Sequence, residues 1–162
     1  MTLVLHLPDA EATGALGRAL ARTLPAQAVV YLDGDLGAGK TTLARALLQA
    51  LGVRGAVRSP TYTLIERYPI EAGEAAHLDL YRIADPEELL YLGLDDLAAS
   101  ARLWLVEWAE RGRGALPAAD LRLGLSVAGH GREAKLEAAS EIGQRWLADL
   151  VKVQSDLPAT TK

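Results

Sequence analysis

The sequence predicts a three-layer α/β/α domain built on a mixed sheet, with a parallel centre and antiparallel hairpins. Two continuous apolar runs, Val29–Leu32 and Leu103–Val106, are typical of strands buried on both faces of a parallel sheet. Helix-forming runs separate the apolar strands, as connections between parallel strands require. The alternating segments 121–127 and 132–138, joined across the glycine-containing turn 129–131, predict a hairpin.

The remaining elements follow in chain order from capping residues and periodicity. Leu3–Leu7 predicts a short strand, and Asp9 is placed to cap a helix over residues 10–24. The segment after the first buried strand predicts a helix over Thr41–Leu51, which Gly52 ends. We expect both helices to pack their apolar faces against the sheet.

The middle of the chain predicts a further hairpin and two short helices. Thr61–Tyr68 alternates as a strand, residues 71–74 form a turn, and Ala75–Leu80 returns as the antiparallel partner. Asp85, followed by a proline and two acids, begins two short helices that extend to about Ser100.

The C-terminal part completes the predicted domain. A glycine-rich connection over residues 111–117 leads to the hairpin 121–138, and a last helix covers about Ser140–Val151. Residues 154–162 have no apolar periodicity, which predicts a disordered tail. The sequence therefore predicts one domain over residues 1–153.

Residues 34–41 carry the most informative motif. They read Gly-Asp-Leu-Gly-Ala-Gly-Lys-Thr, a complete G-x-x-x-x-G-K-[ST] pattern between the first buried strand and a helix. Glycines let successive backbone N–H groups converge on phosphate oxygens, and the following helix directs its positive end at them. The motif in this context predicts a P-loop NTPase-like domain that binds a nucleoside triphosphate.

Two side chains of this phosphate loop have distinct chemical tasks. Lys40 extends toward the β- and γ-phosphates, and the Thr41 hydroxyl is placed to hold Mg²⁺. The other positions contribute backbone, with Asp35 shaping the turn. The predicted nucleotide-binding residues of the loop are Asp35, Leu36, Gly37, Ala38, Gly39, Lys40, Thr41 and Thr42.

A triphosphate site also needs carboxylates at the carboxyl ends of neighbouring strands. Glu107 ends the second buried run, and Asp79 lies near the end of the strand 75–80, where pairing with Arg82 or a capping role is the alternative. We predict Lys40, Asp79 and Glu107 as catalytic residues, and Thr41, Glu107 and Asp79 as Mg²⁺ residues. Either carboxylate is a candidate for positioning the attacking water.

A hydroxyl-rich segment, Ser59-Pro60-Thr61-Tyr62, follows the phosphate-loop helix. A rigid proline between hydroxyls at this place is typical of a nucleotide-sensing switch, although an ordinary strand entry has the same composition. The three histidines have no metal-ligand spacing, and His77 fits the interpretation of an ordinary sheet residue.

Composition excludes several classes of protein. The chain of 162 residues has no cysteine, which excludes disulfides and thiolate metal sites, and it has no run of eighteen uncharged apolar residues. Its N-terminus lacks the features of a signal peptide, so we expect a cytoplasmic protein without a membrane partner. A net charge of −4 does not favour a protein that clamps nucleic acid unaided, so we expect another subunit to provide any RNA contact.

The identity of the nucleobase is constrained by an absent residue type. The chain contains no asparagine, so the N-K-x-D element that reads guanine in small GTPases is missing. This favours ATP over GTP.

Together these motifs resemble the TsaE (YjeE) family, in the family's order and over nearly all of residues 3–150. The matching segments are Gly34–Thr42, Ser59–Leu64, Asp79-Leu80-Tyr81-Arg82, Val106-Glu107-Trp108 and the shorter stretches 7–9, 84–89 and 131–133.

The resemblance implies a bacterial ATPase, using ATP and Mg²⁺, that is needed for threonylcarbamoyladenosine beside the anticodon of tRNA. In that pathway a TsaC-type enzyme makes threonylcarbamoyl-AMP, and TsaD with TsaB transfers the group to tRNA. Family members bind the TsaB–TsaD pair and hydrolyse ATP to drive the cycle. Homologues of TsaD and TsaB are thus the implied partners, and tRNA is met only through their complex.

For individual residues, the resemblance implies that Trp108 lies beside the site, that Thr13 lies near the nucleotide and that Ser59–Thr61 senses it. Two positions depart from the family pattern. Ala109 stands where proline is common, and Leu78 stands where an aromatic residue is frequent. Neither is a proposed metal or phosphate contact.

Two alternative functions fit a small phosphate-loop domain. One is a small-molecule kinase, for which the candidate lid, Arg111-Gly112-Arg113, is short. The other is a nucleotide-dependent switch module without significant turnover.

Overall fold

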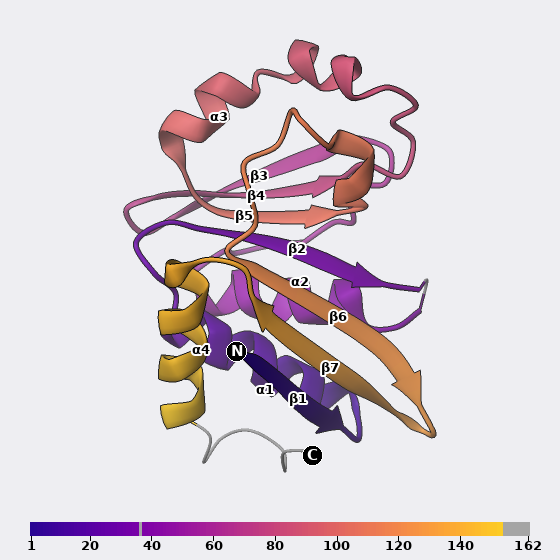
Figure 1. Ribbon diagram of the computed structural model, residues 1–162, viewed down its shortest axis with the longest axis vertical. Coiled ribbons are helices and arrows are strands. Elements are labelled where there is room, and N and C mark those ends of the chain that lie inside the picture. Colours follow the sequence, from indigo (N-terminus) through magenta and orange to yellow (C-terminus); the bar gives the residue numbers. More distant parts are fainter. Residues whose placement is uncertain (36, 154–162) are drawn as a thin grey trace.

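The computed structural model describes residues 1–35 and 37–153 and shows a seven-stranded sheet with helices on both faces (Figure 1). The strands are β1 (Thr2–Leu7), β2 (Ala28–Gly34), β3 (Ile65–Ile70), β4 (Gly73–Asp79), β5 (Ala101–Glu107), β6 (Leu121–Ala128) and β7 (Gly131–Ala138). The helices are α1 (Ala10–Arg22), α2 (Lys40–Ala50), α3 (Leu94–Ser100), α4 (Glu141–Lys152) and two 3₁₀ helices, η1 (Pro86–Leu92) and η2 (Ala109–Gly112).

The centre of the sheet is parallel and its margins are antiparallel. The strand order is β1-β7-β6-β2-β5-β4-β3. Strand β2 pairs in parallel with β5 and β6, and β5 pairs in parallel with β4. The hairpins β6–β7 and β3–β4 and the pair β1–β7 are antiparallel. The predicted α/β class with a mixed sheet is confirmed.

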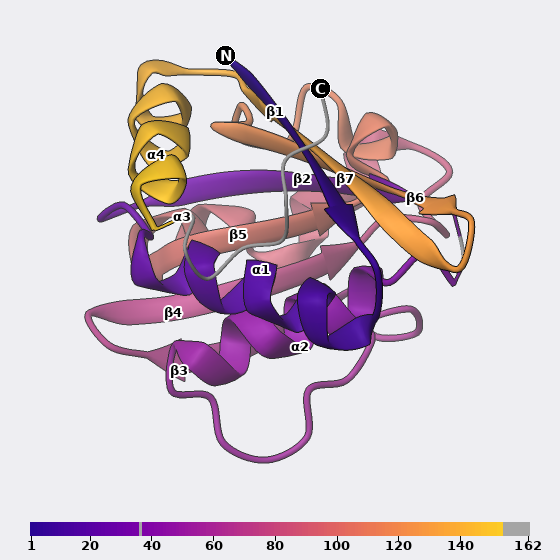
Figure 2. The ribbon, with the colours of Figure 1, turned by 90° about the horizontal axis from the view of Figure 1, so that it is seen from below.

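Two apolar clusters hold the layers together. Helices α1 and α2 lie side by side on one face of the sheet (Figure 2), and α4 joins the same cluster through Trp146. On the opposite face, η1 and α3 cover the half of the sheet that contains β4 and β5 (Figure 1). A β-carbon added at Gly17 of α1 would lie 2.9 Å from the Leu43 carbonyl oxygen, so α1 and α2 approach closely. This packing holds α2, and with it the phosphate loop, against the sheet.

Helix starts follow the expected capping chemistry. The Asp9 carboxylate accepts a hydrogen bond of 2.8 Å from the Ala12 N–H at the start of α1. Asp85 and Glu88 form a reciprocal capping box at the start of η1, with Pro86 in its first turn. These local side chains satisfy N–H groups that the helices leave without partners.

The predicted starts of both strands of the β3–β4 hairpin were wrong. Strand β3 begins at Ile65 and not at Thr61, because the Leu64 N–H donates to the Pro60 carbonyl and Leu64 has a φ of 68°, which closes a turn before the strand. Strand β4 already begins at Gly73, and the reversal before it uses Ala72 at a φ of 63°.

Some predictions concern residues outside those that the structure describes. The proposed tail over 154–162 and the loop position Leu36 lie outside the described residues. The domain boundary at residue 153 stays a prediction. Among the described helices, none combines the length and the apolar composition that a bilayer span requires.

Candidate functional site

A cleft of about 640 Å³ opens where the central strands end and α2 begins. Its walls come from the phosphate loop, from the segment before β3, and from the ends of β4 and β5. Twelve residues line the cleft: Asp35, Gly37, Gly39, Lys40, Thr41, Thr42, Ser59, Thr61, Asp79, Tyr81, Glu107 and Trp108.

The phosphate loop joins β2 to α2 through two glycines in the left-handed region. Gly37 has a φ of 82° and Gly39 a φ of 103°, values that residues with a β-carbon rarely adopt. The Asp35 carbonyl accepts a hydrogen bond of 3.0 Å from the Ala38 N–H, and Arg132 of β7 donates to the Gly37 carbonyl at 3.1 Å. The loop is therefore braced from within and from a distant strand.

The start of α2 has no side-chain cap. Gly39 occupies the N-cap position, so the first-turn N–H groups have no local acceptor of the kind that Asp9 provides for α1. Thr41 and Thr42 of that turn line the cleft. An anion in the cleft would meet these N–H groups and the positive end of an eleven-residue helix.

The two predicted carboxylates lie side by side on adjacent parallel strands. Asp79 of β4 and Glu107 of β5 are register partners, and both are buried, with exposed fractions of 7% and 6%. Alternation along each strand puts them on the face that carries α2, where Ala75 and Leu105 join the α1–α2 cluster. Both acids therefore face the beginning of α2.

Glu107 has a partner on each oxygen. Its Oε1 lies 3.3 Å from the Lys40 Nζ, and its Oε2 lies 2.7 Å from the His77 Nε2. Burial, the largest single influence, raises the pKa of Glu107, but the hydrogen bond and the Coulombic attraction from His77, together with the Lys40 ammonium, outweigh it. The net result is a pKa below the usual value, so the carboxylate is ionised and the cleft holds a paired charge.

This lowered pKa predicts a pH-dependent contribution to stability. The folded chain binds a proton at Glu107 less readily than the unfolded chain, whose carboxyl has a pKa near 4.5. The contribution is therefore present above that value and is lost as the pH falls through the lower folded pKa. Urea unfolding without divalent ions, from about pH 7 down to about pH 3, should show the stability advantage over Glu107→Gln shrinking on acidification. An advantage that grows on acidification would contradict the assignment.

Asp79 connects the cleft wall to the predicted switch. Its Oδ1 accepts from the Tyr81 N–H at 3.0 Å, and its Oδ2 accepts from the Thr61 hydroxyl at 3.4 Å. Because the Thr61 proton points to Asp79, the Ser59 hydroxyl is the donor in the 2.8 Å contact between Ser59 and Thr61. The alternative pairing partner Arg82 instead stacks over the Tyr62 ring at 4.5 Å.

Aromatic and cationic side chains form the rim of the cleft. Trp108 follows Glu107 with a φ of 58°, a conformation that costs an aromatic residue about 1–3 kcal/mol and turns the chain sharply out of β5. Its ring packs edge-on against Tyr81 at 5.0 Å. The Arg111 guanidinium lies 5.4 Å from both rings, and the Lys40 Nζ lies 5.9 Å from the Trp108 ring.

Most predicted site residues meet in this cleft, and four described ones do not line it. Ala38 is buried beneath the loop. Thr13 is buried in α1, where its methyl would lie 3.8 Å from a β-carbon at Gly39, so it supports the loop from behind. Pro60 and the exposed Tyr62 belong to the switch segment but lie outside the lining.

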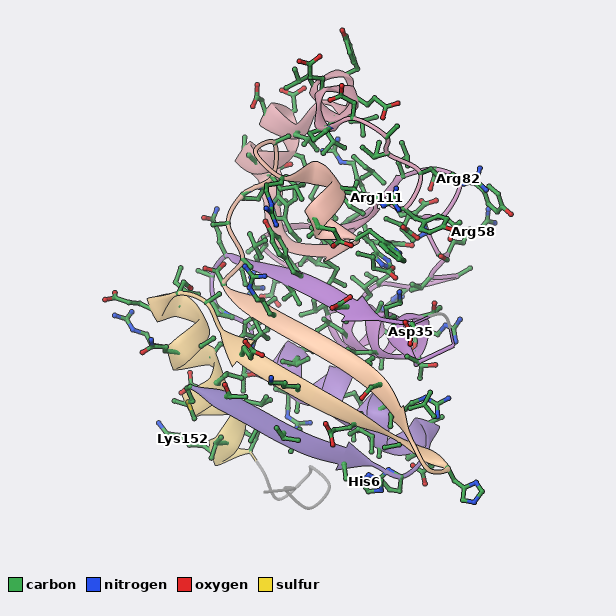
Figure 3. The ribbon with its side chains drawn as sticks, turned by 45° about the vertical axis from the view of Figure 1, so that its right-hand side comes forward. His6, Asp35, Arg58, Arg82, Arg111 and Lys152 are labelled. Atoms are coloured by element: carbon green, nitrogen blue, oxygen red, sulfur yellow. The ribbon has the colours of Figure 1, made fainter. Side chains whose placement is uncertain are left out.

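Sequence reasoning missed several participants. His77, which the sequence indicates only as an ordinary sheet residue, hydrogen-bonds to the predicted site residue Glu107. Tyr81, inside the Asp-Leu-Tyr-Arg motif, lines the cleft. Arg58, Arg82 and Arg111 are scattered along the chain, yet Figure 3 shows them on the same side of the molecule as Asp35 of the phosphate loop. Only folding brings these arginines together.

The oxygen ligands in the cleft fit Mg²⁺ bound together with a nucleotide. Thr41, Asp79 and Glu107 offer the hard oxygen atoms that Mg²⁺ prefers. Within residues 1–35 and 37–153, no three His, Asp or Glu side chains cluster closely enough to hold a metal alone. Mg²⁺ usually keeps waters and takes its remaining ligands from substrate phosphates, so this sparse set suits that mode of binding.

Fold and cleft together define a P-loop α/β protein, in which a glycine-rich loop between strand and helix faces carboxylates on neighbouring strands. A family model described as threonylcarbamoyl adenosine biosynthesis protein TsaE matches residues 7–135. The chain belongs to the TsaE family, and the resemblance found in the sequence is confirmed.

Individual relatives agree with this assignment. The tRNA threonylcarbamoyladenosine biosynthesis protein TsaE of Haemophilus influenzae is 46% identical over 120 residues, which cover 74% of this chain and 76% of the relative. The TsaE protein of Streptomyces coelicolor is 38% identical over 143 residues, which cover 85% of this chain and 96% of the relative. The crystal structure of YdiB from Bacillus subtilis superimposes with a TM-score of 0.80 at 29% identity, covering 94% of this chain and 95% of YdiB.

Proposed function

We propose that this chain is an ATPase that serves the threonylcarbamoyladenosine modification of tRNA in the cytoplasm, together with homologues of TsaB and TsaD. The observation that carries the proposal is the cleft in which the phosphate loop faces two buried carboxylates. The family supplies the pathway, since its model and its relatives carry threonylcarbamoyladenosine biosynthesis in their names.

In this proposal the triphosphate lies along the start of α2. The N–H groups of the loop and of the first helical turn bind the phosphate oxygens, and Lys40 neutralises charge on the β- and γ-phosphates. Thr41, with Glu107 and Asp79, holds Mg²⁺ directly or through water. The bound Mg²⁺ would supply electrostatic stabilisation of the charge on the phosphates.

Turnover requires a nucleophilic water as well as bound phosphates. Asp79 and Glu107 are both positioned to accept a hydrogen bond from such a water, because both line the cleft next to the loop. A purely nucleotide-binding switch has less need of two buried acids at this place. The arrangement therefore favours hydrolysis over binding alone.

The isolated chain should hydrolyse ATP slowly. The Ser59–Thr61–Asp79 hydroxyl chain ends in a long 3.4 Å contact, so the switch segment is weakly tied to the site. We propose that a partner surface orders this segment and completes the site. An acidic chain with a net charge of −4 also suits indirect contact with tRNA through its partners.

The test of activation compares ATPase rates of the chain alone and with the TsaB–TsaD homologues of the same organism. We expect the partners to raise the hydrolysis rate about tenfold or more. Positioning the attacking water typically accelerates such a reaction by at least this factor. Mixtures containing Lys40→Ala provide the background of contaminating ATPases. Equal rates with and without partners would contradict activation. Co-purification of the chain with the TsaB–TsaD homologues in the presence of ATP but not of ADP would support nucleotide-dependent binding.

A further inference from the structure

His77 is a buried titratable side chain to which the proposed function assigns no task. It lies on β4, two residues before Asp79 and on the same face of the sheet, and only 1% of it is exposed. Its Nε2 is 2.7 Å from the Glu107 Oε2. Its Nδ1 is buried and has no hydrogen-bond partner among the described residues.

The surroundings of the ring select one tautomer. The ionised carboxylate of Glu107 can only accept a hydrogen bond, so the His77 Nε2 carries the proton and donates it. In the neutral ring Nδ1 then presents a lone pair. The contact with Glu107 therefore requires a proton on Nε2.

We expect nucleotide binding to change the contact of Glu107 with Lys40 and to leave its contact with His77 in place. Lys40 holds Oε1 in the free protein, at 3.3 Å, but its ammonium is also the group that the β- and γ-phosphates require. Once Lys40 turns to the phosphates, Glu107 keeps only the His77 hydrogen bond. A carboxylate with one fixed oxygen retains its direction, whereas an unanchored one gains rotamer freedom.

We propose that His77 is a positioning residue that fixes Oε2 of Glu107, so that Oε1 stays directed into the cleft after Lys40 leaves it. The proposal rests on the proposed function, because it concerns the nucleotide-bound, metal-dependent state. It gives a buried histidine in the middle of a strand a reason beyond packing.

The first experiment separates positioning from folding with two substitutions. His77→Leu removes the donor and keeps an apolar side chain in the buried site, whereas His77→Gln retains an amide N–H that reaches about as far as Nε2. His6→Leu, on the exposed side of β1 and outside the lining of the cleft, is the matched control. The readouts are Mn²⁺ binding in the presence of a non-hydrolysable ATP analogue, by electron paramagnetic resonance, and analogue binding in EDTA, by calorimetry.

We expect His77→Leu to weaken Mn²⁺ binding about tenfold or more and to change metal-free analogue binding by less than about twofold, because outer partners of a ligand act on the metal. His77→Gln should restore most of the Mn²⁺ affinity, and His6→Leu should behave as the parent chain. Unchanged Mn²⁺ binding in His77→Leu would overturn the proposal. An equal loss in both assays would also overturn it, since it would indicate a merely structural role.

The second experiment needs no nucleotide and so distinguishes this proposal from the proposed function. Nitrogen-15 NMR of the free chain, with His77 assigned by the His77→Gln variant, should show a protonated Nε2. An unprotonated Nε2 would overturn the positioning role, because the ring would then have no donor for Glu107. A parent chain that binds no ATP analogue would instead contradict the proposed function, whatever the state of His77.

Discussion

Replacing Lys40 by alanine should lower the affinity for ATP about 100-fold, which corresponds to about 2.7 kcal/mol. The Lys40 side chain is only 12% exposed in the cleft wall, so its charge would act on phosphate oxygens with little screening. Hydrogen bonds to charged groups typically contribute about 1.5–3 kcal/mol, and Lys40 is placed to make more than one. Calorimetric titration with ATP in the presence of EDTA measures the effect.

The size of this loss has a second cause. Without Lys40, the buried Glu107 carboxylate faces the incoming phosphates with no cation between them. The double variant Lys40→Ala, Glu107→Gln should therefore recover part of the lost affinity, since the repulsion is removed with the charge. Undiminished ATP affinity in Lys40→Ala would refute the assigned role.

A matched control removes the same charge elsewhere. Lys135→Ala on β7 deletes a lysine that is 57% exposed and pairs with Glu137 at the surface. We expect ATP affinity to stay within about twofold of the parent, because Lys135 lies outside the cleft lining and exposed charges are screened by salt. Thermal unfolding of all variants shows whether any loss of binding comes from a loss of folded protein.

Replacing Glu107 by glutamine should reduce ATP hydrolysis about 100-fold while leaving the chain folded. Glutamine has nearly the same shape, and its amide oxygen still accepts the hydrogen bond from the His77 Nε2. What is lost is the negative charge that pairs with Lys40 and that, in our proposal, serves Mg²⁺. Losses of this order are typical when a charge aligned with a transition state is removed. Steady-state rates over a range of Mg²⁺ concentrations give both the turnover and the apparent metal requirement.

The affinity of Glu107→Gln for ATP without metal should not fall as its hydrolysis rate does. In Glu107→Gln the Lys40 ammonium no longer pairs with a carboxylate at 3.3 Å and is free to meet the phosphates, so affinity in EDTA should be equal or higher. Glu110→Gln, three residues further on and exposed, removes the same charge as a control. Turnover that is unchanged in Glu107→Gln and lost in Asp79→Asn would transfer the main metal role to Asp79.

The parts of the fold that sequence reasoning predicted correctly are those decided by short-range chemistry. The phosphate loop is recognisable because its glycines, Lys40 and Thr41 act within eight consecutive residues. Asp9 and Asp85 were predicted as caps at helix starts because a cap needs only the next three residues. The buried strands β2 and β5 were predicted because strands covered on both faces are apolar throughout.

The errors arose where a distant contact outweighed local composition. The segment 61–64 alternates like a strand, yet its backbone closes a turn, and the Leu64 carbonyl accepts from the Asp79 N–H of β4. That contact depends on where β4 lies, which no local pattern in 61–64 encodes. The same turn keeps Thr61 near Asp79. The start of β3, which was predicted wrongly, therefore lies beside residues of the candidate site.

The sequence by itself determined that this protein carries a P-loop motif, that its centre is a parallel sheet and that Asp79 and Glu107 end strands near the loop. These follow from residue order, because side-chain periodicity and capping act over a few residues. Only the tertiary structure decided that His77 holds Glu107 and that Arg132 of β7 braces the loop at Gly37. The partners in these pairs are 30 and 95 residues apart, and their meeting is set by strand order and register, which depend on the packing of the whole sheet.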